Sequence, residues 1–443
     1  MYHFYMGSVV MQKKSVFLLM CAVLITSLSS CVRNMPQNVQ SVDASVPADE
    51  AVASSPAETV APAEDAAAAA SNAPADTDAS DVGIRQILLQ SDAVAAEAYR
   101  LMCEMATEYP DRDITRADSD HGACRGWIIR TLREMGYEGQ IRIDRHKVTQ
   151  TGRADGDTAK ENTFELSNIE LTVPGKDPSR QIIVGAHYDG TGAGDNASGV
   201  GLLLAAANAL KDTHPDLTVK IVFFDAEEEG YLGSIMYAGA MSEEEIASTV
   251  LMINLDALAF GDYCNIYGGV TDRKTGEVTR TEGYDLAVRY ARELGFHVYG
   301  PEELDGYFEK YGEGPPPDEI GIFTNPWTKA HPMPSADSLH ANLVVFSPST
   351  ADISVHRDFA ARGIPYVYFE ATNWFAAGHP HLAYTGYYET YISTIGEYGM
   401  FMNTEYDTLE NLEKYFPGRA EAHFRLYAPV LLSLMLHPEG TDG

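Results

Sequence analysis

Residues 181–210 decide the fold, and their sequence is QIIVGAHYDGTGAGDNASGVGLLLAAANAL. The apolar run at 181–186 predicts a short buried strand. A glycine-rich loop follows it, and the apolar residues at 198–210 then predict a helix. A strand, a loop and a helix in this order are typical of an α/β domain, in which strands and helices alternate along the chain.

The same alternation continues through the rest of the folded region. Further strands are predicted at 140–148, 168–173, 217–224, 250–255 and 366–370. Patterns that predict helices lie at 90–107, 121–136 and 419–436. We therefore expect residues 85–443 to form a single α/β domain with a mostly parallel central sheet flanked by helices. The proline-containing residues 297–350 have poor periodicity and are expected to form long loops over the site.

Polar side chains follow three of the predicted strands, at or just beyond their ends. Because ligand-binding loops lie at the carboxyl ends of parallel strands, we expect these side chains to meet at one edge of the sheet. One imidazole with several carboxylates is the ligand mixture typical of zinc or a similar divalent ion. The residues concerned are His187, Asp189, Asp195, Glu227, Glu228 and Asp256.

The chemistry of each cluster indicates a role. His187 can bind a metal through one ring nitrogen while Asp189 accepts a hydrogen bond from the other nitrogen. Asp195 can bridge two cations, although a helix N-cap by this residue or its neighbour is the alternative. Of the adjacent glutamates Glu227 and Glu228, one can bind a metal while the other acts as a general base.

The sequence argues against other interpretations of these motifs. Asp195 stands where a dinucleotide-binding loop would need a third glycine, and two aspartates in this loop would repel a pyrophosphate. The chain has no His-Glu-x-x-His, Gly-x-Ser-x-Gly or Gly-Lys-Ser/Thr motif, so the corresponding metal, serine and phosphate sites are not expected. Asp256 is either a metal ligand or a helix-cap or salt-bridge partner at a strand end.

In this order the motifs resemble the co-catalytic zinc aminopeptidases, which are the family twenty-eight metallopeptidases of clan MH. The family also contains glutamate carboxypeptidases, glutaminyl cyclases and receptor-like domains without catalysis. The resemblance runs from residue 167 to the C-terminus and implies a zinc-exopeptidase-like fold. Further similar segments, at 355–365, 370–374 and 417–419, are closest to the periplasmic alkaline phosphatase isozyme conversion aminopeptidase subgroup.

The resemblance also implies a reaction and a role for each residue. The reaction is hydrolysis of the N-terminal residue of a peptide by metal-activated water. The implied roles are His187 and Asp256 as ligands of one zinc, Asp195 as the bridging carboxylate, Glu228 as a ligand of the second zinc, Glu227 as the general base, and Asp189 behind His187.

One position departs from the family. The family supplies a last histidine ligand a few residues before an Asp-Thr or Asp-Asn pair, but Asn403 stands there, before Asp407-Thr408. Asparagine is a poor zinc ligand compared with imidazole. The fifth ligand is therefore Asn403, His379, His381 or absent, and the sequence leaves open whether one or two zinc ions bind.

The N-terminus has the features of a bacterial lipoprotein signal. Lys13 and Lys14 precede an apolar stretch at 16–28, which is short for a membrane span, and Ser-Ser-Cys ends it. We expect residues 1–31 to be a signal peptide that ends at a lipidated Cys31, with an ordinary signal peptide as the alternative. The residue after the cysteine is not aspartate, which favours the outer membrane of a bacterial envelope.

The amino-acid composition indicates a tether and limits the classes of partner. Residues 32–84 are rich in Ala, Pro, Ser and acidic residues, and we expect them to form a disordered tether. The formal net charge of -33 disfavours binding to nucleic acid and is compatible with peptide substrates, although solubility alone would also explain it. Cys103 and Cys124 either form a disulfide or stay free like Cys264.

We therefore expect an envelope-anchored zinc aminopeptidase with Glu227 as its base. Two alternatives remain open. The departure at Asn403 motivates a catalytically weak, peptidase-like binding domain, against which the presence of Glu227 argues, because a pure binder needs no base. The second alternative is a glutaminyl cyclase that uses a single zinc.

Overall fold

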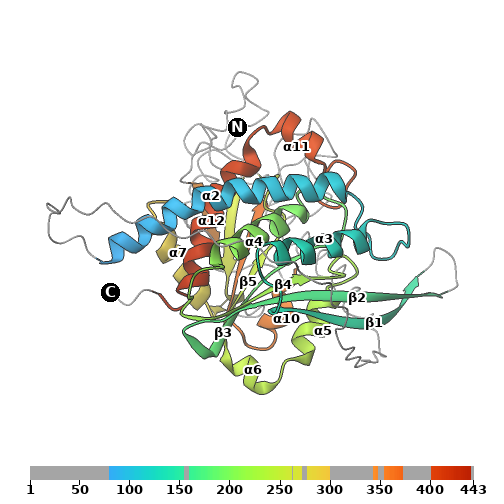
Figure 1. Cartoon of the computed structure of the whole chain (residues 1–443), viewed down its shortest axis with the longest axis horizontal. Helices are drawn as coiled ribbons and strands as arrows, with labels where there is room; N and C mark the ends of the chain where they lie inside the picture. Colours follow the sequence, from blue (N-terminus) through green and yellow to red (C-terminus); the bar gives the residue numbers. More distant parts are fainter. Residues whose placement is uncertain are drawn as a thin grey trace, which may run out of the picture. The chain divides into compact units, whose positions relative to one another are not determined.

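The structure, a computed structural model, describes residues 79–153, 159–261, 263–271, 277–299, 343–347, 354–372 and 401–440 (Figure 1). The predicted signal peptide, most of the predicted tether, His379, His381 and most of 297–350 lie outside these residues. Residues His146–Glu165 belong to one compact unit, and the other described residues belong to a second. The second unit contains every residue of the candidate site.

In the described part of the chain, nine strands form one sheet in the order β1-β2-β4-β3-β5-β11-β6-β10-β9. The strands are β1 (Ile141–Arg153), β2 (Ala159–Val173), β3 (Asp177–His187), β4 (Leu217–Phe224), β5 (Thr249–Leu255), β6 (Tyr263–Gly268), β9 (His297–Tyr299), β10 (Leu343–Ser347) and β11 (Tyr366–Thr372). Two short strands, β7 (Val270–Thr271) and β8 (Val278–Thr279), pair separately.

The centre of the sheet is parallel. Strand β3 pairs in parallel with both β4 and β5, and β11 continues in parallel next to β5. Antiparallel pairing occurs between β2 and β4 and between β11 and β6, while β10 is parallel to β6 and to β9. The predicted α/β fold with a mostly parallel sheet is therefore confirmed.

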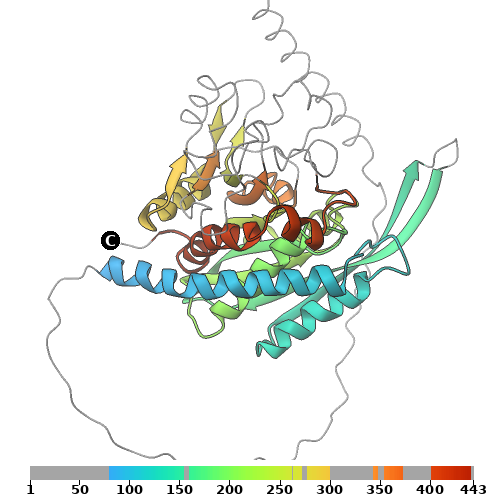
Figure 2. The same cartoon turned by 90° about the horizontal axis from the view of Figure 1, so that it is seen from above.

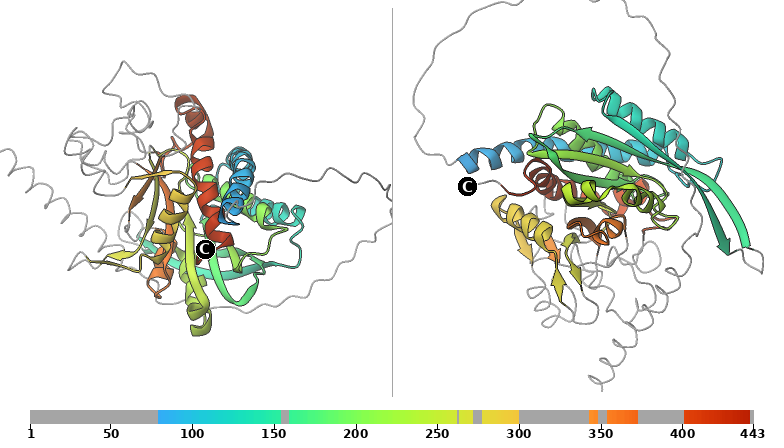
Figure 3. Two further views of the ribbon diagram at one scale, coloured as in Figure 1. Left: turned by 90° about the vertical axis from the view of Figure 1, so that its left-hand side faces the viewer. Right: turned by 90° about the horizontal axis from the view of Figure 1, so that it is seen from below.

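Helices cover the sheet. They are α2 (Ala79–Glu108), α3 (His121–Glu134), α4 (Ala197–Leu210), α5 (Leu232–Ala240), α6 (Glu243–Ser248), α7 (Glu282–Glu293), α10 (His356–Ala360), α11 (Leu409–Tyr415) and α12 (Arg419–Leu436). Helices α2, α4 and α12 pack against one another (Figure 2). Helix α12 lies between α2 and α7 (Figure 3). Helices α5 and α10 contribute to a separate core.

Alternate residues of the central strands enter the two cores, because successive side chains of a strand point to opposite faces. On β3, Ile182 and Val184 belong to the core under α2, α4 and α12, whereas Ile183 belongs to the core under α5 and α10. Strand β4 divides in the same way between Phe223 and Phe224. Burial on both faces explains why the parallel strands are continuous apolar runs in the sequence.

Helix α4 follows the glycine-rich loop and lies against α2. A Cβ atom at Gly201 would come within 2.6 Å of the Ala98 carbonyl oxygen, so glycine is needed for this close approach. The N-terminus of α4 is thereby fixed directly behind the loop that carries Asp195.

Most of the predicted elements are present, with small differences in their bounds. Helix α2 begins at Ala79, inside the predicted tether, and β9 and β10 lie in the region expected to form loops. Cys103, Cys124 and Cys264 are free thiols, so the alternative of a disulfide is not found. Among the described helices, none combines the length and apolar character needed to cross a membrane.

Candidate metal centre

The central parallel strands bring the predicted residues to one edge of the sheet. His187 is the last residue of β3, and Asp256 directly follows β5. Glu227 and Glu228 lie in the loop after β4, and Asp195 lies in the loop between β3 and α4. Residues far apart in the sequence therefore meet because three neighbouring strands end at the same edge.

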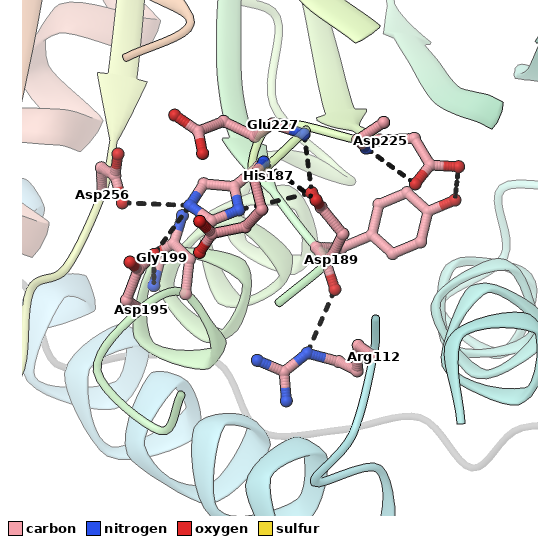
Figure 4. Close-up of polar contacts among 12 residues, drawn as sticks. Arg112, His187, Asp189, Asp195, Gly199, Asp225, Glu227 and Asp256 are labelled. Carbon is pink, nitrogen blue, oxygen red and sulfur yellow. Dashed lines mark hydrogen bonds and ion pairs between the residues drawn. The ribbon is translucent and has the colours of Figure 1, made fainter. Parts of the chain in front are cut away.

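Three of the four predicted metal ligands form a cluster that could hold an ion: His187, Asp195 and Asp256 (Figure 4). His187 Nε2 lies 2.8 Å from Asp195 Oδ1 and 3.2 Å from Asp256 Oδ1. All three side chains are buried, and one ligand atom from each lies within 4.8 Å of the others. Glu228 is not part of this cluster, but the repulsion between its carboxylate and the other carboxylates affects the pKa values of the site.

Asp195 is free to point into the cluster because its neighbour caps the helix. Asn196 is the N-cap of α4, and its Oδ1 accepts hydrogen bonds from the backbone N–H groups of Gly199 and Ala257. Its Nδ2 donates to the Leu255 carbonyl oxygen at 2.9 Å. Asn196 therefore fixes the loop of Asp195 to the end of β5, and Asp195 itself is not the helix cap.

Asp189 connects the histidine to the two glutamates. Its carboxylate accepts hydrogen bonds from the backbone N–H groups of Glu227, at 3.0 Å, and Glu228, at 3.1 Å. His187 Nδ1 lies 3.5 Å from Asp189 Oδ1, which is an ion-pair distance rather than the predicted hydrogen bond. Asp189 is therefore a positioning residue for both loops of the site.

The described residues fit a divalent cation. Glu228 Oε1 is buried and has no hydrogen-bond partner, and the buried Asp195 Oδ1 has an ion pair with His187 but no hydrogen bond, so both oxygens could take a metal ion as a partner. Nitrogen and carboxylate ligands are those that zinc prefers. His187, Asp195 and Asp256 would hold one ion, and Glu228 offers an oxygen for a second.

The charges in the site raise several pKa values in the metal-free protein. Burial, followed by repulsion from Asp195, raises the pKa of Glu228 to about 9. Burial also raises the pKa of Glu227 well above its usual range and, with repulsion from Asp256, raises that of Asp195. Burial alone would lower the pKa of His187, but the surrounding carboxylates raise it well above its usual range. A cation would relieve this repulsion.

We expect the free energy of unfolding of the metal-free protein to fall as the pH rises. The pKa of Glu228 rises from 4.5 to about 9 on folding, and burial raises that of Asp407 from 3.8 to about 7. Between the unfolded and the folded pKa of each group, the folded state binds more protons than the unfolded state. The free energy of unfolding is therefore highest at low pH and decreases as the pH rises to about 9. Urea denaturation of the chelated protein at about pH 5.5 and about pH 8.5 measures this.

The zinc-saturated protein is the control. Its free energy of unfolding should decrease less over the same pH range, because the cation compensates the negative charge of the carboxylates. A chelated protein whose free energy of unfolding stays level or increases with pH would contradict this account of the site.

Asp407 is a site residue that the sequence indicated only as part of a family motif. Its carboxylate accepts hydrogen bonds from the backbone N–H groups of Gly194, at 2.6 Å, and Asp195, at 2.9 Å. A Cβ atom at Gly192 would lie 2.0 Å from Asp407 Oδ2, so only glycine fits there. The segment before α11 thus holds the Asp195 loop in place.

Further contacts hold Asp256. Ser354 Oγ donates a hydrogen bond to Asp256 Oδ2 at 2.7 Å and accepts one from Asn254 Nδ2. From α12, Arg419 donates to the Phe260 carbonyl oxygen and His423 Nδ1 to that of Leu258. Arg419 lies in the similar segment at 417–419, whereas Ser354 and His423 belong to no motif that could have identified them.

The backbone is strained on both sides of the cluster. Ala226, with φ 53°, precedes Glu227, and Ala257, with φ 51°, follows Asp256. Tyr231, with φ 66°, lies four residues beyond Glu227. A left-handed conformation costs a non-glycine residue roughly 1–2 kcal/mol, and such residues gather at functional sites.

Asn403, at the position of the family's last histidine, is exposed and has φ 57°. The three clustered ligands are buried, so the structure does not place Asn403 among them. The alternatives His379 and His381 lie outside the described residues. The fifth ligand therefore remains an open prediction.

Known proteins resemble this chain in sequence and structure. Residues 168–307 match the sequence model of Peptidase family M28. The alkaline phosphatase isozyme conversion protein of Escherichia coli (strain K12) is 27% identical over 331 residues, which cover 70% of this chain and 81% of that protein. Aminopeptidase YwaD of Bacillus subtilis (strain 168) is 39% identical over 79 residues, 17% of each chain. A glutaminyl cyclase structure from an Acidobacteriales bacterium has a TM-score of 0.48 at 17% identity, covering 78% of this chain and 95% of that one.

Proposed function

We propose, since residues 168–307 of this chain are those of a family M28 peptidase, that the protein is a zinc-dependent aminopeptidase. The family predicted from the sequence is confirmed, and with it a hydrolase that acts on peptides. The observation that carries the finer proposal is the buried cluster of His187, Asp195 and Asp256 with the carboxylate of Glu227 close by (Figure 4). Such a cluster has the ligands of a catalytic metal and a base that is not itself a ligand.

His187, Asp195 and Asp256 would hold one zinc, and Asp195 with Glu228 would face a second. Zinc supplies Lewis acidity, which polarises the scissile carbonyl group and acidifies water. The chain's own residues then bind the substrate, move the proton and stabilise the charge that develops.

Glu227 is the general base of this proposal. Its backbone is fixed by the hydrogen bond to Asp189, and its side chain is 8% exposed. A carboxylate in this position takes a proton from the attacking water and passes it to the leaving amine. Glu228, whose backbone is fixed by the same aspartate, has a buried Oε1 without a hydrogen-bond partner and is left to bind metal.

Tyr231 is the proposed donor to the developing oxyanion. Its backbone N–H donates to the Glu227 carbonyl oxygen at 2.7 Å, and its ring lies 4.5 Å from the Arg357 guanidinium carbon. Burial, followed by the charge of Glu227, raises the pKa of its hydroxyl, which therefore stays protonated. A neutral donor in a largely buried site is suited to stabilising an oxyanion.

Carboxylates in excess of cations also favour the N-terminal end of a peptide. The α-ammonium group of a substrate carries the positive charge that this acidic site lacks.

We further propose that the protein is a lipoprotein of a bacterial envelope, anchored through Cys31 and facing the periplasm. The charged, apolar and Ser-Ser-Cys segments of residues 13–31 support this proposal. Metabolic labelling with a fatty acid should modify the full-length chain, and Cys31→Ala should abolish the labelling. Equal labelling of both chains would contradict the anchor.

The purified protein is expected to release the N-terminal residue from aminoacyl-arylamides, and chelation should abolish this activity while added zinc restores it. The same preparation gives the zinc content per chain, and two ions would support the bridging role of Asp195. A control reaction with N-acetylated arylamides should show no turnover, because the α-ammonium group is blocked.

Absence of chelator-sensitive turnover on every aminoacyl-arylamide tested would overturn the aminopeptidase proposal. Formation of pyroglutamate from a peptide with N-terminal glutamine would then identify a glutaminyl cyclase. Zinc binding without either reaction would identify a peptidase-like binding domain.

A further inference from the structure

We propose that Arg112 and His121, which precede the residues matched by the family model, are positioning residues for the metal centre. Both lie in or directly after the loop between α2 and α3, and both side chains are buried. Arg112 contacts the loop that carries His187 and Asp195, and His121 contacts the loop that carries Glu227. This inference rests on the proposed zinc site. Residues 109–121, which contain both side chains, are called the brace.

Arg112 holds the loop after β3 through its carbonyl groups. Its Nε, whose contact is drawn in Figure 4, donates to the Tyr188 carbonyl oxygen at 3.1 Å. Its Nη2 donates to the Gly192 carbonyl oxygen at 2.8 Å. Its backbone N–H donates to the Gly190 carbonyl oxygen at 2.8 Å. These three acceptors span the chain between His187 and Asp195, so the guanidinium group sets the separation of two metal ligands.

The burial of Arg112 indicates that this contact is specific. The residue is 0% exposed, and its remaining donor Nη1 contacts the Tyr109 carbonyl oxygen at 2.8 Å. A buried guanidinium group is costly unless its donors are satisfied, and here backbone carbonyl groups satisfy them. Its positive charge also lowers the pKa of Asp407, against the larger effect of burial, and so partly offsets the carboxylates of the site.

His121 reaches the other loop through a fully buried carboxylate. Its Nε2 donates to Asp225 Oδ1 at 2.7 Å, and Asp225 Oδ2 accepts from the Tyr188 hydroxyl at 2.7 Å. The Ala226 backbone N–H also donates to Asp225 Oδ1. Asp225 is therefore fixed from several sides directly before the strained Ala226 and the base Glu227 (Figure 4).

Tyr188 couples the two contacts. Its carbonyl oxygen accepts from Arg112, its hydroxyl donates to Asp225, and its ring stacks on that of His121 with centroids 5.3 Å apart. Tyr188 directly follows His187 in the chain. Removing either brace residue should therefore shift ligands on both sides of the centre, although neither residue touches the metal or the substrate.

The test uses Arg112→Met, which keeps most of the volume, removes every side-chain donor and leaves the backbone hydrogen bond to Gly190. Zinc affinity, measured by competition with a chromogenic chelator, is expected to fall by roughly 10–100-fold, the range typical when groups that orient metal ligands are removed. The kcat should fall while KM changes little. Arg116→Met is the matched control, because Arg116 lies in the same loop but is exposed and pairs with Asp111 on the surface.

His121 gives an independent test that does not depend on Arg112 variants folding. His121→Leu removes the donor to Asp225, whereas His121→Gln keeps a side-chain N–H and should recover most of the zinc affinity and kcat. Thermal unfolding of the metal-free proteins is measured in parallel. A role in stability alone would lower the melting temperature of both His121 variants without separating them in zinc affinity.

The inference would be overturned if folded Arg112→Met or His121→Leu bound zinc as tightly as the parent protein. It would also be overturned if His121→Gln lost as much zinc affinity as His121→Leu. Because zinc affinity is measured without substrate, a parent protein that binds zinc but hydrolyses no peptide would disprove the proposed function and still test the brace.

Discussion

Replacing Glu227 with glutamine is expected to lower kcat by about 10²–10⁴-fold while the zinc content stays unchanged. The amide keeps the size of the side chain but cannot accept the proton of the attacking water. The hydrogen bond from the Glu227 backbone N–H to Asp189 is independent of the side chain, so the loop should keep its position. Steady-state rates on an aminoacyl-arylamide, with zinc measured by atomic absorption, test this.

Glu229→Gln is the matched control, because it makes the same chemical change two residues away in the same loop. Glu229 is outside the described cluster and has no assigned role. The control should keep the parent kcat and zinc content. A Glu227→Gln variant with a kcat within a few-fold of the parent would show that another group accepts the proton, and a variant without zinc would make Glu227 a ligand instead.

Replacing Asp195 with asparagine should have the largest effect on metal binding. Asp195 Oδ1 lies 2.8 Å from His187 Nε2, is buried and has no hydrogen-bond partner. The amide keeps the shape but removes the negative charge that a divalent cation needs. We expect zinc affinity to fall at least ~100-fold and activity to be lost at ordinary zinc concentrations.

The same substitution should raise the melting temperature of the metal-free protein. Burial and repulsion from Asp256 raise the pKa of Asp195 against the attraction of His187, and burial and repulsion from Asp195 raise that of Glu228, so an amide at position 195 removes a charge that the metal-free site disfavours. The increase in melting temperature that zinc gives the parent should disappear. Asp212→Asn, at an exposed position, is the control and should change neither quantity.

Two results would contradict this assignment. Parent-like zinc affinity in Asp195→Asn would mean that His187 and Asp256 suffice with other ligands. A metal-free variant that melts below the metal-free parent would mean that the ion pair of Asp195 with His187 outweighs the burial and repulsion of its charge.

The central strands and the clustered ligands could be predicted from the sequence because both depend on local patterns. Strand β4 has the predicted bounds, and β3 and β5 differ from theirs only at the ends. Burial on both faces leaves a continuous apolar run, and such a run is visible without knowing its neighbours. The parallel topology then places His187, Asp195 and Asp256 together with no further information.

The position of β11 could not be predicted in the same way. It lies between β5 and β6, parallel to one and antiparallel to the other. Pairing between strands depends on contacts distant in the sequence, and the run at 366–370 contains no signal for its neighbours. The same limit applies to Asp407 and Ser354, whose contacts with the ligand loops become visible only in the folded chain.

The role of Asp189 was predicted in part. The residue lies beside His187 as expected, but its hydrogen bonds go to the backbone of Glu227 and Glu228. A side chain two residues from a histidine suggests a partner for that ring. The loop after β4 approaches Asp189 with two backbone donors. This approach depends on how the strands pair in the sheet, so the sequence contains no pattern that predicts it.

The contacts of Arg112 and Asp407 bear on the modularity of the domain. The ligands and the base lie within one short portion of the chain, residues 187–256. The side chains that hold their loops, Arg112 and Asp407, lie well before and well after that portion. The portion that a motif search recognises is therefore not an autonomous module. The residues that carry its chemistry are local, but its geometry depends on the entire fold, so two chains with the same residues at 187–256 can differ in catalytic rate through residues outside that portion.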